Sequence, residues 1–103
     1  MAKSMKESQF QEKVIKHLKS LPNTWYVKIW GGGFMKAGIP DIICCINGRF
    51  VALELKQENG KPSELQKRNI RLINEANGVG IILYPHDFEE FKKSAWRLID
   101  GVS

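Results

Sequence analysis

Hydrophobic residues recur every three to four positions in three stretches of the chain, with polar residues between them. This spacing places the hydrophobic side chains on one face of a helix. In the first stretch, for example, lysines separate Phe10, Val14 and Leu18. Ser63, a residue type favoured at helix N-caps, precedes the second stretch. The sequence therefore predicts helices over residues 7–20 and 64–76, and a third helix that opens at Asp87 and runs to residue 99.

Four shorter stretches are rich in β-branched, aromatic or other hydrophobic residues and predict strands. Asn47-Gly48 separates the second from the third, and this dipeptide best fits a two-residue type I′ hairpin loop. The fourth is almost entirely hydrophobic, which is typical of a strand buried on both faces. The predicted strands are residues 25–30, 42–46, 49–55 and 79–84. Together the elements predict an α/β fold in the order α-β-β-β-α-β-α, with a mixed β-sheet flanked by helices.

The chain has 103 residues, of which 43% are hydrophobic, and its 16 Lys and Arg against 11 Asp and Glu give a formal net charge of +5. This hydrophobic content argues against a disordered chain, and the length predicts a single domain over residues 1–103 with no large cavity for an organic cofactor. No hydrophobic stretch approaches the roughly 20 residues that cross a membrane, so we expect no membrane partner. The positive charge fits a polyanion ligand such as nucleic acid, and fits solubility alone equally well.

The two cysteines, Cys44 and Cys45, are adjacent, so in a strand their side chains point to opposite faces. They cannot form a structural disulfide with each other, and with only two histidines in the chain a zinc site lacks ligands. We interpret both cysteines as packing residues in a reducing compartment. The N-terminal segment also lacks the hydrophobic core of a signal peptide. The expected location is cytoplasmic.

The predicted hairpin has a register that can be followed along both strands. If Asn47-Gly48 is a two-residue loop, Ile46 pairs with Arg49. Continuing this antiparallel register away from the loop pairs Asp41 with Glu54. The sequence therefore predicts two carboxylates directly opposite each other.

Opposed residues in a sheet have Cβ atoms about 4.5–5.5 Å apart, and two like charges there destabilise the pair, so something positive should lie between them. Lys56 follows Glu54 by two positions and rises from the same face. One interpretation is an ordinary solvent-exposed face, because a Glu-x-Lys tripeptide alone is common. The hairpin loop, however, sets the register that places Asp41 opposite Glu54. This favours a second interpretation, a site for a hard cation such as Mg²⁺ or Mn²⁺ with a basic residue beside it.

Two further polar residues are candidates for this site. At about 100° per residue, the hydrophobic face of the first helix centres close to Glu7, whereas Glu12 points away. Glu7 either completes an acidic cluster near the cation or stays solvated at the helix start, where acidic residues are favoured. Gln66 lies on the flank of the hydrophobic face of the second helix, and either reaches the site or stays outside it.

With these residues assembled, the sequence resembles the virus-type replication-repair nuclease (VRR-NUC) domain of the PD-(D/E)xK nuclease superfamily. The resemblance runs from Glu7 to about Tyr84 and looks closest to the compact stand-alone members found in phage genomes. It implies a restriction-endonuclease-like core. The matching elements are Glu7, Gly38-Ile39-Pro40-Asp41, Glu54-Leu55-Lys56 and the segment 60–66, which ends in Ser-x-x-Gln.

The resemblance also implies a role for each site residue. Asp41, Glu54 and the backbone carbonyl of Leu55 would bind Mg²⁺ or Mn²⁺, with Glu7 binding a metal directly or through water. The cation would lower the pKa of a bound water and neutralise charge on the scissile phosphate. Lys56 would position the attacking water or stabilise developing negative charge, and Gln66 would orient Lys56 or the water. The implied products are a 5′-phosphate and a 3′-hydroxyl.

Basic residues adjoin these motifs and are expected to contact phosphates. The Gly31–Gly33 run permits close backbone approach to a phosphate, and Phe34 either stacks on a base or simply belongs to a flexible loop. The three tryptophans, by contrast, are expected in the core or at an interface. The candidate DNA-binding residues are Lys28, Gly32, Gly33, Phe34, Lys36, Lys61 and Lys67.

Taken together, these features predict a Mg²⁺- or Mn²⁺-dependent DNA endonuclease. The resemblance implies that it is structure-selective, for branched or Holliday-junction-like DNA in replication, recombination or repair. The resemblance to junction resolvases further implies a homodimer, because two symmetric cuts need two active sites. The implied location is the host-cell cytoplasm if a phage encodes the chain. The alternative is a nucleic-acid-binding module without catalytic activity, in which the acidic cluster is structural.

Overall fold

A computed structural model describes residues 6–30 and 37–101 of the chain. The elements follow the predicted order α-β-β-β-α-β-α, with one short 3₁₀ helix added before the last helix. They are α1 (Glu7–Ser20), β1 (Thr24–Lys28), β2 (Ile42–Ile46), β3 (Arg49–Leu55), α2 (Glu64–Glu75), β4 (Val79–Leu83), η1 (Pro85–Asp87) and α3 (Phe88–Asp100).

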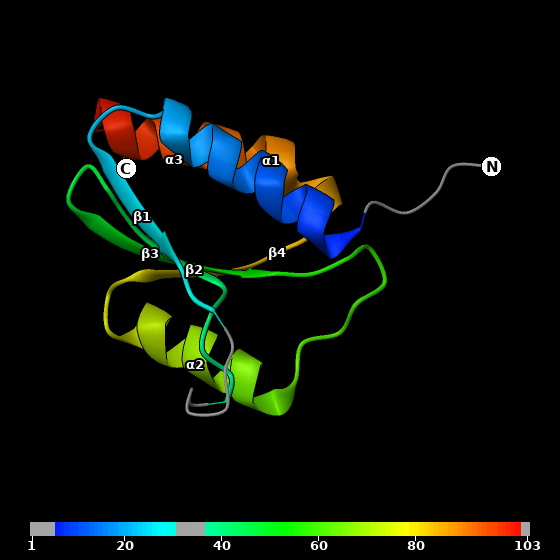
Figure 1. The fold of residues 1–103 in the computed structure, drawn as a ribbon. Coiled ribbons are helices and arrows are strands. Elements are labelled where there is room, and N and C mark those ends of the chain that lie inside the picture. The colour runs from blue at the N-terminus through cyan, green and yellow to red at the C-terminus, as the bar shows by residue number, and fades with distance from the viewer. Residues whose placement is uncertain (1–5, 31–36, 102–103) are drawn as a thin grey trace.

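The strands form one mixed sheet in the order β1-β2-β3-β4. The pairs β1–β2 and β2–β3 are antiparallel, and β3–β4 is parallel, because α2 carries the chain from one end of the sheet back to the other. Helices α1 and α3 lie side by side over one face of the sheet, and α2 lies on the opposite face (Figure 1). The structure thus confirms the α/β fold with helices on a mixed sheet.

The β2–β3 hairpin has the predicted register. Asn47 and Gly48 both have positive φ angles, 49° and 85°, as a type I′ loop requires. Ile46 pairs with Arg49, and the ladder continues to the pair Ile42 and Leu53. The side-chain Nδ2 of Asn47 also donates to the carbonyl of Leu98 at 2.8 Å, so the loop is bound to α3.

The main hydrophobic core lies between the sheet and the α1–α3 layer. On α1, the residues predicted from helical spacing, Phe10, Val14 and Leu18, are all buried. Every second residue of β2 faces them, and Phe91 and Ala95 complete the layer from α3. The other core members from the strands are Ile42, Cys44, Ile46, Val51, Leu53, Leu55 and Leu83.

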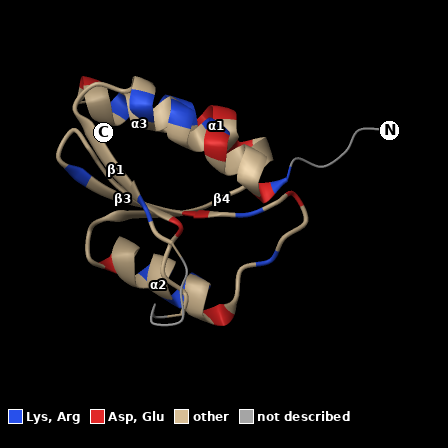
Figure 2. Cartoon of the chain, viewed as in Figure 1, with Lys and Arg blue, Asp and Glu red and all other residues tan. Residues whose placement is uncertain are grey.

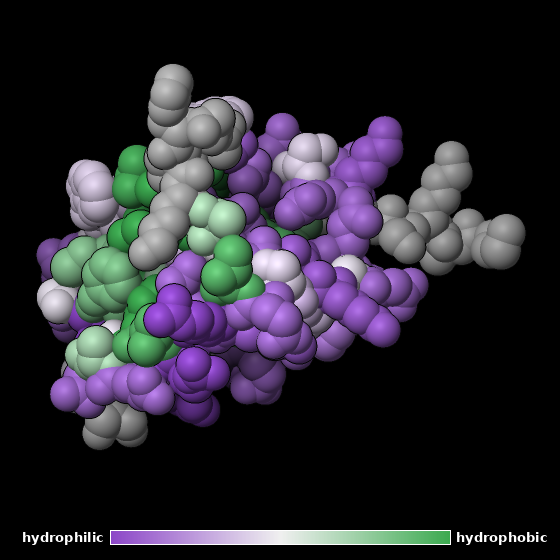
Figure 3. All heavy atoms as spheres, turned by 90° about the horizontal axis from the view of Figure 1, so that it is seen from below, coloured by the Kyte–Doolittle hydropathy of each residue, from purple (hydrophilic) through white to green (hydrophobic). Residues whose placement is uncertain are grey.

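The α2 face of the sheet is packed differently. Only Ile70 of α2 is buried, although the helix approaches the sheet closely. A Cβ atom on Gly80 of β4 would lie 2.9 Å from the carbonyl oxygen of Ile70, so glycine permits this contact. Seen from the α2 side, hydrophobic residues gather over one part of the surface beside hydrophilic ones (Figure 3). This face is only partly covered.

Three sequence expectations need correction. The first strand ends at Lys28 and the last at Leu83, each earlier than predicted. Residues 79–82 are only half-buried, because β4 is an edge strand and has a neighbour on one side only. Cys44 is buried, and burial raises the pKa of its thiol to about 12, whereas Cys45 on the opposite face is exposed.

The tryptophans are not core residues. Trp25, Trp30 and Trp96 are 63%, 73% and 44% exposed, respectively. Trp25 lies in β1, an edge strand of the sheet, and Trp30 follows two residues after the end of this strand. None of the helices that the structure describes in residues 6–30 and 37–101 is long and hydrophobic enough to span a membrane.

Candidate active site

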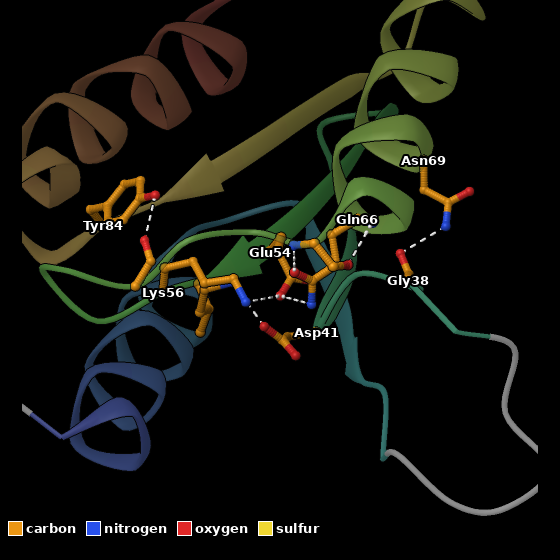
Figure 4. Close-up of polar contacts among 10 residues, drawn as sticks. Gly38, Asp41, Glu54, Lys56, Gln66, Asn69 and Tyr84 are labelled. Carbon is orange, nitrogen blue, oxygen red and sulfur yellow. Dashed lines mark hydrogen bonds and ion pairs between the residues drawn. The ribbon is translucent and has the colours of Figure 1, made fainter.

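Asp41 and Glu54 come together at one end of the sheet. Asp41 directly precedes β2 and Glu54 is the penultimate residue of β3, so continuing the observed register places them opposite each other. The backbone N–H of Leu55 donates to Asp41 Oδ2 at 2.8 Å, which holds this carboxylate at the end of β3 (Figure 4). Acidic and basic positions are neighbours along the end of β3 and the following loop (Figure 2). The predicted opposition of Asp41 and Glu54 is therefore present in the structure.

Glu54 is a buried carboxylate with only 2% of its surface exposed. Its Oε2 accepts a hydrogen bond from Gln66 Nε2 at 3.0 Å and lies 3.6 Å from Lys56 Nζ. Its Oε1 is also buried and has no hydrogen-bond partner among the described residues. Burial and the charge of Asp41 raise the pKa of Glu54 to about 7, and Lys56 opposes this shift.

Lys56 is held close to the two carboxylates by the backbone around it. Its N–H donates to the carbonyl of Leu83 at 3.0 Å, which extends the β3–β4 contact by one residue. The side chain is only 17% exposed, so it is mostly shielded from solvent. The predicted grouping of Asp41, Glu54 and Lys56 is present.

Gln66 reaches the site because of the way α2 begins. Ser63 is the N-cap, and its Oγ accepts from the Gln66 N–H at 3.2 Å. The side-chain Oε1 of Gln66 accepts in return from the Ser63 N–H at 2.8 Å, which completes a capping box. With Oε1 occupied, Nε2 is left to donate to Glu54 (Figure 4). The sequence predicted that Gln66 orients Lys56 or a water; in the structure its direct partner is Glu54.

Asn69 is a functional candidate that the sequence analysis missed. Its Nδ2 donates to the carbonyl of Gly38 at 2.8 Å, three residues before Asp41 (Figure 4). Gly38 has φ of 83°, and a Cβ atom there would lie 2.8 Å from Leu65, so its backbone rests directly on α2. The spacing of Gln66 and Asn69, three residues apart on one helix face, was the available signal. Helix α2 thus contacts the segments that carry both carboxylates.

Glu7 is the first residue of α1 and is exposed, so its side chain does not occupy the inward face that the helical projection predicted. The projection gives the direction of a residue around the helix axis and not its position along the axis, and residues 7–9, which precede the first buried residue, Phe10, are all exposed. Glu12 is exposed as well. Within residues 6–30 and 37–101, no group of three or more His, Cys, Asp or Glu is arranged to hold a metal ion. The structure brings together two of the three predicted carboxylates, and the role of Glu7 stays a prediction.

The residues present nevertheless fit a hard cation. Asp41 and Glu54 offer carboxylate oxygens, the donor type that Mg²⁺ and Mn²⁺ prefer, and Leu55 with its predicted carbonyl ligand directly follows Glu54. Glu54 Oε1, buried without a partner in the described part of the chain, is an oxygen that a cation would satisfy. A cation would also offset the repulsion that raises the pKa of Glu54.

A second cluster fixes the loop that follows Lys56. Tyr84 donates from its hydroxyl to the carbonyl of Gly60 at 2.9 Å. The ring of His86 stacks on that of Tyr84, and its Nδ1 lies 2.6 Å from Glu58 Oε2. This hydrogen bond raises the pKa of His86. The loop between β3 and α2 is therefore anchored to the start of η1, a contact that the sequence analysis did not anticipate.

The candidate DNA-binding residues divide into two groups. Lys61 and Lys67 are exposed near the start of α2, and Lys67 pairs with Glu64 at 3.2 Å. Lys28 is half-buried at the end of β1, where its Nζ lies 3.6 Å from the centroid of the Trp30 ring. The remaining candidates, Gly32, Gly33, Phe34 and Lys36, lie outside the described residues.

Comparisons with known proteins add no assignment to this site. No protein-family model, no curated protein and no solved structure matches the chain.

Proposed function

We propose that this chain is a Mg²⁺- or Mn²⁺-dependent DNA endonuclease of the PD-(D/E)xK type, similar to stand-alone VRR-NUC domains. The observation that carries the proposal is the pair of carboxylates, Asp41 and Glu54, opposed across the hairpin with Lys56 Nζ 3.6 Å from Glu54. A protein that only binds nucleic acid gains nothing from carboxylates facing a phosphate, because like charges repel. The order of the motifs along the chain supports the same reading.

Asp41, Glu54 and the carbonyl of Leu55 are the proposed cation ligands, with Glu7 as a further ligand in the family pattern. A cation held by these residues would lower the pKa of a bound water and offset charge on the scissile phosphate. Lys56 holds a positive charge beside Glu54, where it orients the attacking water or offsets charge that develops on the phosphate. Gln66 keeps Glu54 in place through Nε2. In this proposal the chain cleaves phosphodiester bonds of branched DNA to 5′-phosphate and 3′-hydroxyl ends.

The proposed assembly is a homodimer, because two symmetric cuts across a junction need two active sites and one chain offers one. The proposed location is the cytoplasm, that of the host cell if a phage encodes the chain. The second candidate function is nucleic-acid binding without cleavage. The net charge of +5 favours it as much as it favours a nuclease.

The deciding experiment measures cleavage of four-way, flap, nicked and linear DNA in Mg²⁺, Mn²⁺ or EDTA. We expect cutting only with a divalent cation. Asp41→Asn should lower the rate by more than about 100-fold, since residues that merely support metal ligands already contribute 10- to 100-fold. Asp100→Asn, at the end of α3, is the matched control and should cut like the parent.

Asp41→Asn retains a side-chain oxygen that can accept the Leu55 N–H, so its fold can be checked by circular dichroism against the parent. Cleavage in EDTA, or an Asp41→Asn protein as active as the parent, would exclude the proposed mechanism. DNA binding without cutting under every condition would favour the second candidate.

A further inference from the structure

The end of β1 runs beside the segment that carries Asp41. Lys28 pairs with Ile42, the residue after Asp41, and the N–H of Ile29 donates to the carbonyl of Asp41 at 2.8 Å. Trp30 is the next residue. Lys28 and Trp30 therefore lie at the same end of the sheet as the candidate active site.

Lys28 and Trp30 form a cation–aromatic pair at this position. The ammonium of Lys28 lies 3.6 Å from the centroid of the Trp30 ring, within the range of a cation–π contact. Trp30 is nevertheless 73% exposed, more than Trp25 or Trp96. A single exposed hydrophobic residue is ordinary. Here, however, the exposed indole also contacts a lysine ammonium and lies near the two carboxylates of the candidate active site. This combination points to a binding role more strongly than exposure alone does.

We propose that Lys28 and Trp30 bind an unpaired nucleotide of the DNA, with its base stacked on the Trp30 indole and its phosphate paired with the Lys28 ammonium. An indole offers a stacking surface to any base, and an ammonium pairs with any phosphate, so the site is independent of sequence. Bases inside a duplex are covered on both faces by their neighbours. Only a splayed, unpaired or terminal base can stack on the ring.

This inference rests on the proposed nuclease function for its consequence, which is substrate class. A base held beside Asp41 places its own backbone near the carboxylates, so the enzyme would select DNA in which paired and unpaired nucleotides meet. Flaps, splayed arms and junctions have such nucleotides, and a continuous duplex has them only at its ends. The other use of an exposed tryptophan, as an anchor in a protein interface, is an outcome that the test must separate.

The test measures binding without cleavage, in EDTA, by fluorescence anisotropy of a labelled splayed duplex, a single strand and a closed hairpin duplex. Trp30→Ala should weaken binding of the splayed and single-stranded DNA about 5- to 100-fold, as loss of one stacked base does. Trp30→Phe should retain most of the affinity. Trp25→Ala is the matched control, because Trp25 lies in β1, the strand that leads to Trp30, is 63% exposed and is at the end remote from Asp41.

A second readout follows the indole directly. In a chain carrying Trp25→Phe and Trp96→Phe, Trp30 is the only tryptophan, and its fluorescence should be quenched by the splayed and single-stranded DNA and much less by the closed duplex. Light scattering of the parent and of Trp30→Ala shows whether the residue supports self-association instead.

Equal affinities of Trp30→Ala and Trp25→Ala for splayed DNA would overturn the inference, as would a loss of self-association in Trp30→Ala with unchanged DNA binding per chain. The nuclease proposal is judged separately, by metal-dependent cutting. If the parent cuts DNA and Trp30→Ala binds unpaired DNA as tightly as the parent, the nucleotide site is excluded and the nuclease proposal stands. If the parent cuts no DNA but Trp30→Ala binds unpaired DNA more weakly, the nucleotide site stands and the nuclease proposal is excluded.

Discussion

The two faces of the sheet are held to their helices by different forces. On one face, α1 and α3 bury Phe10, Val14 and Leu18 against alternate strand residues. On the other face, α2 buries only Ile70. Side-chain amides tie it instead to the sheet, at Gln66 and Asn74, and to the segment that precedes β2, at Asn69.

The space on the α2 side is correspondingly less well filled. A surface hollow of about 320 Å³ lies between Ile39, Ile43 and Leu72, and a second of about 270 Å³ lies beside Phe50. Hydrophobic contacts stabilise without direction, whereas hydrogen bonds set positions to within tenths of an ångström. We infer that the α1–α3 face supplies most of the stability and that the α2 face positions the carboxylates.

The largest effect on stability should come from emptying the α1–α3 core. Phe10→Ala removes a ring with no exposed surface, and we expect the free energy of unfolding to fall by about 3–5 kcal/mol. Phe50→Ala is the matched control on the other face, where Phe50 is 44% exposed. This substitution should lower the free energy of unfolding by about 1 kcal/mol or less. Urea unfolding followed by circular dichroism measures both. Equal losses would contradict the division between the faces.

The next effect concerns the charge buried under α2. The pKa of Glu54 is raised to about 7 from its ordinary value of 4.5, so the folded protein binds a proton that the unfolded chain releases. In EDTA the parent should therefore lose stability as pH rises from about 5 to 8, and Glu54→Gln should not share this loss. We expect the variant to gain roughly 2–3 kcal/mol on the parent across this range.

Thermal or urea unfolding at pH 5 and pH 8 measures this difference. Glu12→Gln, an exposed acid on α1, should follow the parent at both pH values. Adding Mn²⁺ should raise the stability of the parent at pH 8 and leave Glu54→Gln nearly unchanged, because binding to the folded state alone stabilises it. If Glu54→Gln differs in stability from the parent by the same amount at pH 5 and pH 8, the Glu54 carboxylate is not the source of the pH dependence.

The smallest expected effect distinguishes two of the side-chain amides that hold α2, those of Asn69 and Asn74. Asn69→Ala releases Gly38 and the segment leading to Asp41, and should lower Mn²⁺ affinity about 10- to 100-fold, as loss of a supporting hydrogen bond does. Asn74→Ala is the control, because Asn74 exchanges hydrogen bonds of 3.1 and 2.8 Å with Gly80 at the far end of the helix. It should destabilise the chain without changing Mn²⁺ affinity. Isothermal titration calorimetry decides, and equal affinities for the two variants would remove the proposed positioning role of Asn69.

Much of the site could be predicted because it depends on local geometry. Asn47-Gly48 accepts the positive φ angles of a type I′ loop, and this loop alone sets which residues of β2 and β3 face each other. Asp41 and Glu54 follow from counting along the two strands. The N-cap at Ser63 was equally local, since its partner Gln66 is three residues away.

The contacts that could not be predicted join residues far apart in the chain. Asn69 binds Gly38 across 31 positions, and His86 binds Glu58 across 28. Trp30 was expected in the core or at an interface because it is large and hydrophobic, yet it lies two residues beyond the end of the edge strand β1 and is exposed. Glu7 has the helical phase of the buried residues but is exposed, because it precedes the first buried residue of α1, Phe10.

The sequence by itself determined the order of elements, the register of the hairpin and the opposition of Asp41 and Glu54, because backbone preferences and side-chain periodicity act over a few residues. Tertiary structure alone decided that β4 is an edge strand and that α2 lies against both carboxylate segments. It also decided that Lys28 and Trp30 end beside Asp41. These outcomes depend on how whole helices and strands pack, and no local pattern encodes which surface a distant element will cover.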